Sequence, residues 1–249
     1  MPTIDVNGFT MYYEARGEGE PLVLLHGGTG VGADWRHVFS VDPPGYRVVV
    51  PDLRGHGRST NPSRQFTVRQ SARDVAALLD HLGLGRVKAI GMSMGAKTLL
   101  HLATADRERV EAMVLVSAAP YFPAQVRAAM AQFDADRLSE AEWTALRARH
   151  VHGDDQIRAL WEMTRGFASS YDDMAFTPPL LATIAARTLV VHGDRDPFYP
   201  VELAFELHRG IPGSALWVVP YGGHGPIFGP QAAHFGEIAI GHLRGEIKN

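Results

Sequence analysis

Two hydrophobic patterns alternate along this chain. Short continuous apolar runs are typical of strands buried on both faces of a sheet, whereas apolar residues that recur every three or four positions are typical of amphipathic helices. The apolar runs lie at residues 21–25, 46–51, 87–90, 110–116, 188–191 and 215–219. Helices are expected at residues 32–39, 67–82, 96–103, 200–208 and 231–247. This alternation predicts an α/β fold with a mostly parallel sheet covered by helices on both faces.

The first residues follow a different rule. Apolar side chains alternate with polar ones on both sides of Asn7-Gly8, a dipeptide that favours a two-residue turn between antiparallel strands. We therefore expect a β-hairpin at the start of the chain.

Residues 121–186 interrupt the alternation of strands and helices. This stretch is amphipathic, rich in Ala, Arg, Asp and Met, and contains no convincing strand. It is too long for a plain connection between two elements. We therefore predict a core made of residues 1–120 and 187–249, with residues 121–186 inserted as a helical lid.

Composition narrows the class of protein. The chain has 249 residues, 45% of them hydrophobic, a formal net charge of −3 and no cysteine. This charge gives no electrostatic reason to bind nucleic acid or an anionic membrane, and disulfides and thiolate catalysis are excluded. The N-terminal residues lack a signal-peptide pattern, and no apolar run is long enough to span a membrane. We expect a soluble cytoplasmic protein, monomeric or homodimeric, that acts on a small molecule.

The sequence Gly91-Met92-Ser93-Met94-Gly95 lies between an apolar run and a helical pattern. In this strand–turn–helix context a Gly-x-Ser-x-Gly motif carries a nucleophile. The tight turn pushes the serine hydroxyl out above the sheet, and glycines on either side leave room for the neighbouring backbone. Ser93 is therefore the predicted nucleophile.

A serine needs a base, and the base needs an orienting partner. Of the 12 histidines in the chain, His224 follows the last predicted strand and lies between two glycines. It also follows the acid candidates, which is the chain order expected with this motif. We expect His26, His56 and His192, which lie at other strand ends, to stabilise loops.

The strand at 110–116 has no carboxylate after it, so the acid is sought at the next strand end, which offers two aspartates. We choose Asp196, because Pro197 makes the chain after it rigid, and assign Asp194 to backbone hydrogen bonds of the turn. Asp194 stays an alternative, because turn chemistry fixes side-chain direction only loosely.

An oxyanion needs backbone donors. The peptide N–H of Met94 points to the space above Ser93, and that of Gly28 follows a buried strand in a glycine turn. We assign both to the predicted oxyanion hole.

Two other groups of residues invite a binding function. His150 and His152 lie in a polar stretch of the lid, but residues two apart on a helix do not share a face, so we expect a surface loop and no metal site. Arg54 and Arg58 could bind an anion, although their loop more often serves structure.

Taken together, these motifs resemble those of the α/β-hydrolase superfamily. The matching motifs span nearly the whole chain outside the lid, at residues 25–28, 52–59, 91–95, 193–196 and 222–224. The resemblance implies an eight-stranded sheet, a cap over the site, a catalytic triad of Ser93, Asp196 and His224, and no cofactor. Serine at position 93, rather than aspartate, argues against the epoxide hydrolase and dehalogenase branches.

The activity that we expect is carboxylesterase-type: hydrolysis of a small, largely apolar ester through an acyl-enzyme on Ser93. Two alternatives use the same triad. One is hydrolysis of a carbon–carbon bond in a β-diketone or of an enol lactone, and the other is perhydrolysis or halogenation without a cofactor. A ligand receptor on a retained hydrolase scaffold is the alternative from a different class.

Overall fold

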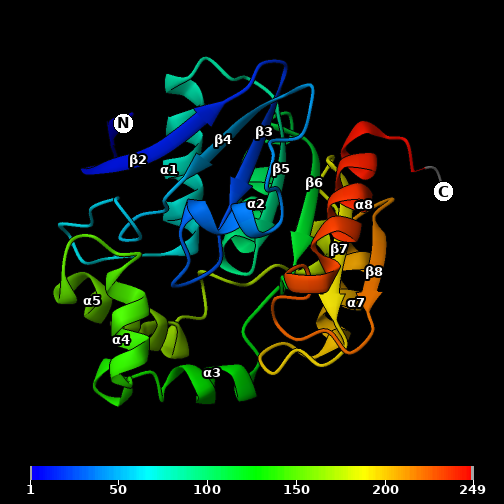
Figure 1. Cartoon of the computed structure of the whole chain (residues 1–249). Coiled ribbons are helices and arrows are strands. Elements are labelled where there is room, and N and C mark those ends of the chain that lie inside the picture. The colour runs from blue at the N-terminus through cyan, green and yellow to red at the C-terminus, as the bar shows by residue number, and fades with distance from the viewer. Residues whose placement is uncertain (1, 248–249) are drawn as a thin grey trace.

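An eight-stranded sheet runs through the computed structural model, which describes residues 2–247 (Figure 1). Its strands lie in the order β1-β2-β4-β3-β5-β6-β7-β8. The strands are β1 (Thr3–Val6), β2 (Phe9–Arg16), β3 (Glu20–Leu25), β4 (Tyr46–Pro51), β5 (Val87–Met92), β6 (Val110–Val116), β7 (Arg187–Gly193) and β8 (Ala215–Val219). Strand β2 pairs antiparallel with both β1 and β4. The remaining neighbours in this order, from β4 through β3 to β8, pair in parallel. The predicted fold class is confirmed.

Helices follow most of the parallel strands. The α-helices are α1 (Val68–His81), α2 (Met94–Ala105), α3 (Ala124–Met130), α4 (Glu140–Arg147), α5 (Asp154–Gly166), α6 (Pro178–Leu181), α7 (Val201–Gly210) and α8 (Ala232–Arg244). Short 3-10 helices lie at η1 (Gly32–His37), η2 (Ala135–Arg137), η3 (Phe167–Ser169) and η4 (Gly229–Gln231). Within residues 2–247, none of the helices has the length and apolar character needed to cross a bilayer.

The sheet separates two hydrophobic cores. Side chains alternate along each strand, so that in β3 Val23 and Leu25 face one core while Leu22 and Leu24 face the other. Helices α1, α2 and α7 cover the first face, and η1 and α8 cover the second. This two-sided burial explains why the parallel strands are continuous apolar runs in the sequence.

Local residues set the ends of the elements. Asn7 and Gly8 both have positive φ, 46° and 81°, as the predicted hairpin turn requires. Helix α1 begins after Thr67, whose side chain accepts a hydrogen bond from the Gln70 N–H. Helix α8 ends at Arg244, before the expected boundary at residue 247, because Gly245 has a φ of 74° and caps it in the left-handed conformation.

The chain between β6 and β7 forms α3 to α6 and two of the short 3-10 helices. Figure 1 shows α3, α4 and α5 grouped at the end of the sheet toward which the arrows of β6 and β7 point. Part of this helical segment packs on a small core of its own, formed by Ala135, Trp143, Leu146 and Ile157. The division at residues 121 and 186 stays a prediction.

The expectation of a surface loop at His150 is wrong, since only 1% of this residue is exposed. Its Nδ1 accepts a hydrogen bond from the Gly57 N–H at 2.9 Å, and its Nε2 lies 3.1 Å from the Thr29 carbonyl. Burial lowers the pKa of His150 to about 4, so the ring stays neutral at pH 7. His150 therefore joins the helical segment to two loops of the sheet edge.

Arg54 and Asp74 form a buried ion pair that fixes the loop after β4. The Arg54 guanidinium donates to the Asp74 carboxylate at 2.8 and 2.9 Å, and both residues are at most 5% exposed. Asn7 and Gln70 also donate to the same carboxylate. Arg58 lies against the Tyr12 ring and donates to its hydroxyl. Both arginines therefore have structural partners.

We expect Asp74→Ala to lower the free energy of unfolding by about 3–5 kcal/mol, because it leaves the buried Arg54 charge without its carboxylate. Urea denaturation measures this loss. Asp80→Ala is the matched control. Asp80 lies on α1 like Asp74 and pairs with Arg109, but its side chain is 65% exposed, and we expect a loss below about 1 kcal/mol. Equal losses for the two variants would contradict the structural role of the buried pair.

Candidate active site

Ser93 lies in the turn between β5 and α2, with a φ of 49° and a ψ of −106°. Positive φ is strained for a residue other than glycine. Backbone bonds on both sides hold it there: the Ser93 N–H donates to the Val116 carbonyl at 2.8 Å, and the Ser93 carbonyl accepts from the Lys97 N–H at 3.0 Å. The serine is thereby fixed at the carboxyl end of β5.

Gly91 and Gly95 make this turn possible. A Cβ at Gly91 would lie 2.6 Å from the Ala96 nitrogen, and a Cβ at Gly95 would meet the carbonyl groups of Leu25 and His26. These neighbours are backbone atoms and cannot rotate away. The predicted reason for both glycines, lack of space for a side chain, therefore agrees with the geometry.

His224 joins Ser93 to Asp196. Its Nε2 lies 2.9 Å from Ser93 Oγ, and its Nδ1 lies 2.8 Å from Asp196 Oδ2. With a proton on Nδ1, the ring donates to the carboxylate and accepts from the serine hydroxyl. Three residues that follow β5, β7 and β8 thus meet at one edge of the sheet.

The Asp196 carboxylate is buried but fully bonded. Its side chain is 0% exposed; besides His224, the N–H groups of Phe198 and Tyr199 donate to Oδ1 at 2.8 and 3.1 Å. Burial alone would raise the pKa of Asp196, but the His224 ring and the two N–H donors outweigh it and bring the pKa below its ordinary value. The carboxylate is therefore ionised at neutral pH.

The loop that carries His224 is held close to the sheet. Ser117, after β6, donates from Oγ to the His224 carbonyl at 2.7 Å. The rings of Phe198 and Tyr199 pack against the imidazole, with centroids 4.9 and 5.6 Å from it. These contacts limit the rotation of His224 and keep it between its two partners.

Asp194 is exposed. The backbone hydrogen bonds that we assigned to Asp194 are made by Asp196 instead. The other strand-end histidines have loop partners: His26 accepts from the Leu53 N–H at 2.9 Å, and His192 lies 2.8 Å from the Tyr199 carbonyl.

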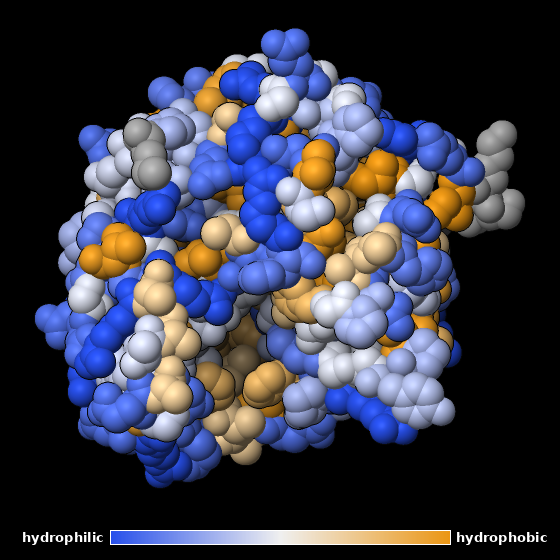
Figure 2. Space-filling model, in the orientation of Figure 1, coloured by the Kyte–Doolittle hydropathy of each residue, from blue (hydrophilic) through white to orange (hydrophobic). Residues whose placement is uncertain are grey.

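A pocket of about 260 Å³ opens beside Ser93 and His224. Gly28 and Met94, the residues predicted to supply oxyanion donors, both line it. Its far wall comes from the helical segment and is mainly apolar, formed by Phe122, Met130, Phe133, Met163, Thr164 and Phe167. Figure 2 shows the surface hollowed between the helical segment and the sheet, with hydrophobic residues gathered at the rim.

Lys97 also lines this pocket, and the sequence analysis missed it. It lies one helical turn after Ser93 and is only 4% exposed. Burial lowers the pKa of Lys97 to about 7. One signal was present in the sequence: Lys97 is the only Asp, Glu, Lys or Arg in the stretch that forms α2.

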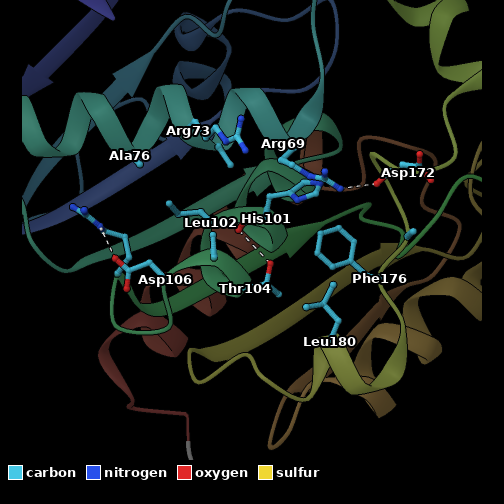
Figure 3. Close-up of a pocket in the computed structure, with 14 residues that line it drawn as sticks. Arg69, Arg73, Ala76, His101, Leu102, Thr104, Asp106, Asp172, Phe176 and Leu180 are labelled. Carbon is cyan, nitrogen blue, oxygen red and sulfur yellow. Dashed lines mark hydrogen bonds and ion pairs between the residues drawn. The ribbon is translucent and has the colours of Figure 1, made fainter. Parts of the chain in front are cut away.

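A larger pocket, of about 340 Å³, lies away from the triad between α1, α2 and residues 172–180 (Figure 3). Several of its polar side chains are bound to neighbours: Arg69 donates to the Asp172 carbonyl, His101 lies 2.6 Å from the Asp173 carbonyl, and Arg109 pairs with Asp80. None of the predicted site residues lines it. The pocket beside Ser93 is therefore the candidate active site.

Within residues 2–247, no three His, Asp or Glu side chains are grouped so that they could hold a metal ion.

The sequence profile of the family described as "alpha/beta hydrolase fold" matches residues 20–165. This match covers more than half of the chain, and the chain belongs to that family. The matched residues include the β5–α2 turn with Ser93 but end before Asp196 and His224.

Individual relatives carry different activities in their names. The chain is 28% identical, over 86% of its length and 81% of the relative's, to 2-hydroxy-6-oxo-6-(2'-aminophenyl)hexa-2,4-dienoic acid hydrolase from Metapseudomonas resinovorans. It is 37% identical to soluble epoxide hydrolase from Corynebacterium sp. (strain C12), but over only 46% of this chain and 40% of that protein.

Among solved structures, a meta-cleavage product hydrolase from Pseudomonas fluorescens IP01, complexed with acetates, superposes with a TM-score of 0.81. The superposition covers 99% of this chain and 98% of that one, at 20% identity. This likeness is one of fold.

We expect Gly91→Ala to cost about 1–3 kcal/mol in the free energy of unfolding, because the new methyl group forces the backbone of the β5–α2 turn apart. It should also slow the labelling of Ser93 by an organophosphonate. Gly85→Ala is the control: a Cβ there has nothing within 4 Å, so we expect a change within about 0.5 kcal/mol. If the Gly91→Ala protein were as stable and as readily labelled as the control, the turn would have space for a side chain at position 91, and the prediction would be wrong.

Proposed function

We propose that this protein is a serine hydrolase that cleaves a carboxylic ester of a small molecule through an acyl-enzyme on Ser93. The observation that carries the proposal is the chain of two hydrogen bonds, 2.9 Å from Ser93 to His224 and 2.8 Å from His224 to Asp196. A serine hydroxyl is a weak nucleophile alone, and this arrangement gives it a base whose orientation is fixed.

In the first step the Ser93 oxygen attacks the ester carbonyl, and His224 Nε2 takes the hydroxyl proton. The imidazolium that forms is stabilised by the ionised Asp196, which does not itself become protonated. When the tetrahedral intermediate collapses, His224 gives the proton to the leaving alcohol. Water, activated in the same way by His224, then attacks the acyl-enzyme and releases the acid.

The negative charge on the tetrahedral intermediate needs donors. We assign the N–H groups of Met94 and Gly28, which line the same pocket as Ser93. Among residues 2–247 neither amide donates to another backbone carbonyl, so both are free for a ligand oxygen. Each such donor is typically worth about 2.7–4 kcal/mol in the transition state.

The walls of the pocket favour a substrate of modest size with a largely apolar acyl or alcohol part. We propose that residues 121–186 act as the lid, since Phe122, Met130 and Met163 line the same pocket as Ser93.

A second candidate is hydrolysis of a carbon–carbon bond beside a ketone, with the same three residues. It is favoured by the relative from Metapseudomonas resinovorans, whose name describes the hydrolysis of a hydroxy-oxo-hexadienoic acid and which matches most of the chain. This candidate uses the same serine at position 93, but it requires a pocket that accommodates a longer unsaturated acid.

We expect Ser93→Ala to reduce kcat on a 4-nitrophenyl ester by about 10⁵–10⁶-fold, because it removes the attacking oxygen. The variant should unfold at the same urea concentration as the wild type and should resist organophosphonate labelling. Ser40→Ala, at an exposed position, is the control and should keep full activity. A folded Ser93→Ala protein with undiminished esterase activity would refute the nucleophile.

A substrate panel separates the two candidates. Aliphatic and aryl esters of graded acyl length, lactones and 2-hydroxy-6-oxo-dienoates are assayed side by side on wild type and Ser93→Ala. We expect the highest kcat/KM on short esters. Turnover of the dienoates at least about tenfold above every ester would transfer the proposal to carbon–carbon hydrolysis, with the triad retained.

A further inference from the structure

Ester hydrolysis by Ser93, His224 and Asp196 assigns no role to Lys97, although this lysine lines the same pocket as Ser93. Its ammonium lies 2.9 Å from the Tyr199 hydroxyl and faces two aromatic rings, with the centroid of Tyr199 at 4.6 Å and that of Phe122 at 5.3 Å. Lys97 belongs to α2, Phe122 to the helical segment and Tyr199 to the loop after β7. The amine is thus enclosed by three separate parts of the chain.

Burying an ammonium is unfavourable unless a partner compensates for the lost water. Lys97 has three N–H donors when charged, and the one side-chain hydrogen bond described for it uses one of them. Among residues 2–247 no carboxylate lies within ion-pair distance of its Nζ. Asp196 attracts the charge from farther away, but its oxygens are already bound to His224, Phe198 and Tyr199.

Lys88 shows how this chain satisfies a lysine whose task is structural. It is as buried as Lys97, with 6% exposed, yet its Nζ lies 2.6 Å from Glu20 Oε2. In the described part of the chain, no carboxylate takes that position beside Lys97. The difference between the two lysines lies in the missing anion, and Lys97 faces the pocket that a ligand would enter.

We propose that Lys97 binds an anionic oxygen of the substrate, so that the preferred esters carry a free carboxylate at the end of an apolar acyl chain. This inference rests on the proposed ester hydrolysis at Ser93. Lys97 follows Ser93, the N-cap residue of α2, by four positions, and both line the same pocket of about 260 Å³. The carboxylate therefore lies a few carbons from the ester carbonyl, as in a half-ester of a short dicarboxylic acid.

Binding of such a carboxylate stabilises the charged form of Lys97, whose pKa burial has lowered to about 7. The free protein holds the amine partly neutral at pH 7, and the complex takes up a proton. Affinity for the anion should therefore fall as the pH rises above 7. The titratable groups that share this part of the site are Tyr199, His224 and Asp196, whereas the lid presents Phe122, Met130, Phe133 and Met163, which carry no charge.

The first test compares two substrates of one size: monoethyl adipate and its neutral amide, ethyl 6-amino-6-oxohexanoate. We expect wild type to prefer the acid in kcat/KM at pH 6.5, and Lys97→Met to reduce the acid-to-amide ratio by about 10- to 100-fold, the range for a hydrogen bond to a charged group. Lys88→Met is the control and should keep the wild-type ratio. A ratio in Lys97→Met equal to that of wild type would overturn the proposal.

The second test measures binding without hydrolysis, in Ser93→Ala protein by calorimetry. We expect Kd for monoethyl adipate to rise between pH 6.5 and pH 8.5, with proton uptake at pH 8 detected from two buffers of different ionisation enthalpy. The double variant Ser93→Ala, Lys97→Gln keeps a polar partner for Tyr199 without the charge, and it should lose both the preference for the acid and the proton uptake.

The outcomes of the two tests separate the inference from the proposed function. If wild type hydrolyses neither compound but Ser93→Ala binds the acid through Lys97, ester hydrolysis fails and the anion subsite stands. If both esters are hydrolysed and Ser93→Ala binds the acid and the amide equally at every pH, the subsite fails and ester hydrolysis stands.

Discussion

The close contact between the β5–α2 turn and the end of β3 is the constraint on which the site depends. Backbone atoms occupy the space that side chains at Gly91 and Gly95 would need, and the chain between them is forced through a positive φ at Ser93. The strain is sustained because β5 is a central strand, bonded to β3 and β6 on either side. The pairing of β5 with both neighbours therefore offsets the strain and holds the Ser93 hydroxyl toward the pocket.

The parallel arrangement of the strands then decides which residues can meet that hydroxyl. Loops after β7 and β8 leave from the same edge of the sheet as the turn after β5, and they carry Asp196 and His224. Burial of Asp196 would be costly alone, but three donors satisfy its oxygens. Charge, orientation and access are thus provided by separate loops on one scaffold.

Much of this arrangement follows from the sequence, because two-sided burial makes the parallel strands apolar and because strand ends carry the polar residues. The sequence favoured Asp196 and left Asp194 as the alternative, since both lie in one turn and only side-chain direction, which the hydrogen bond from His224 to Asp196 gives, separates them. The prediction of a surface loop at His150 was wrong because the burial of this residue comes from contacts with Gly57 and Thr29, which are far from it in the chain. The sequence analysis missed Lys97 because a helical pattern indicates on which side of the helix a residue lies, but not whether a cavity lies beside it.

The pocket is built from two chemically different halves. Loops at the sheet edge contribute Ser93 and His224, helix α2 contributes Lys97, and the helical segment contributes an apolar wall. Ser93 and His224 follow strand ends, whereas the wall belongs to a segment that has a small core of its own. Relatives of this chain bear the names of quite different hydrolases, as expected where one fold hosts many activities. Lys97, which within residues 2–247 has no carboxylate at ion-pair distance, lies between Tyr199 of the polar half and Phe122 of the wall, and helix α2 thereby also contributes to the proposed selection of the substrate.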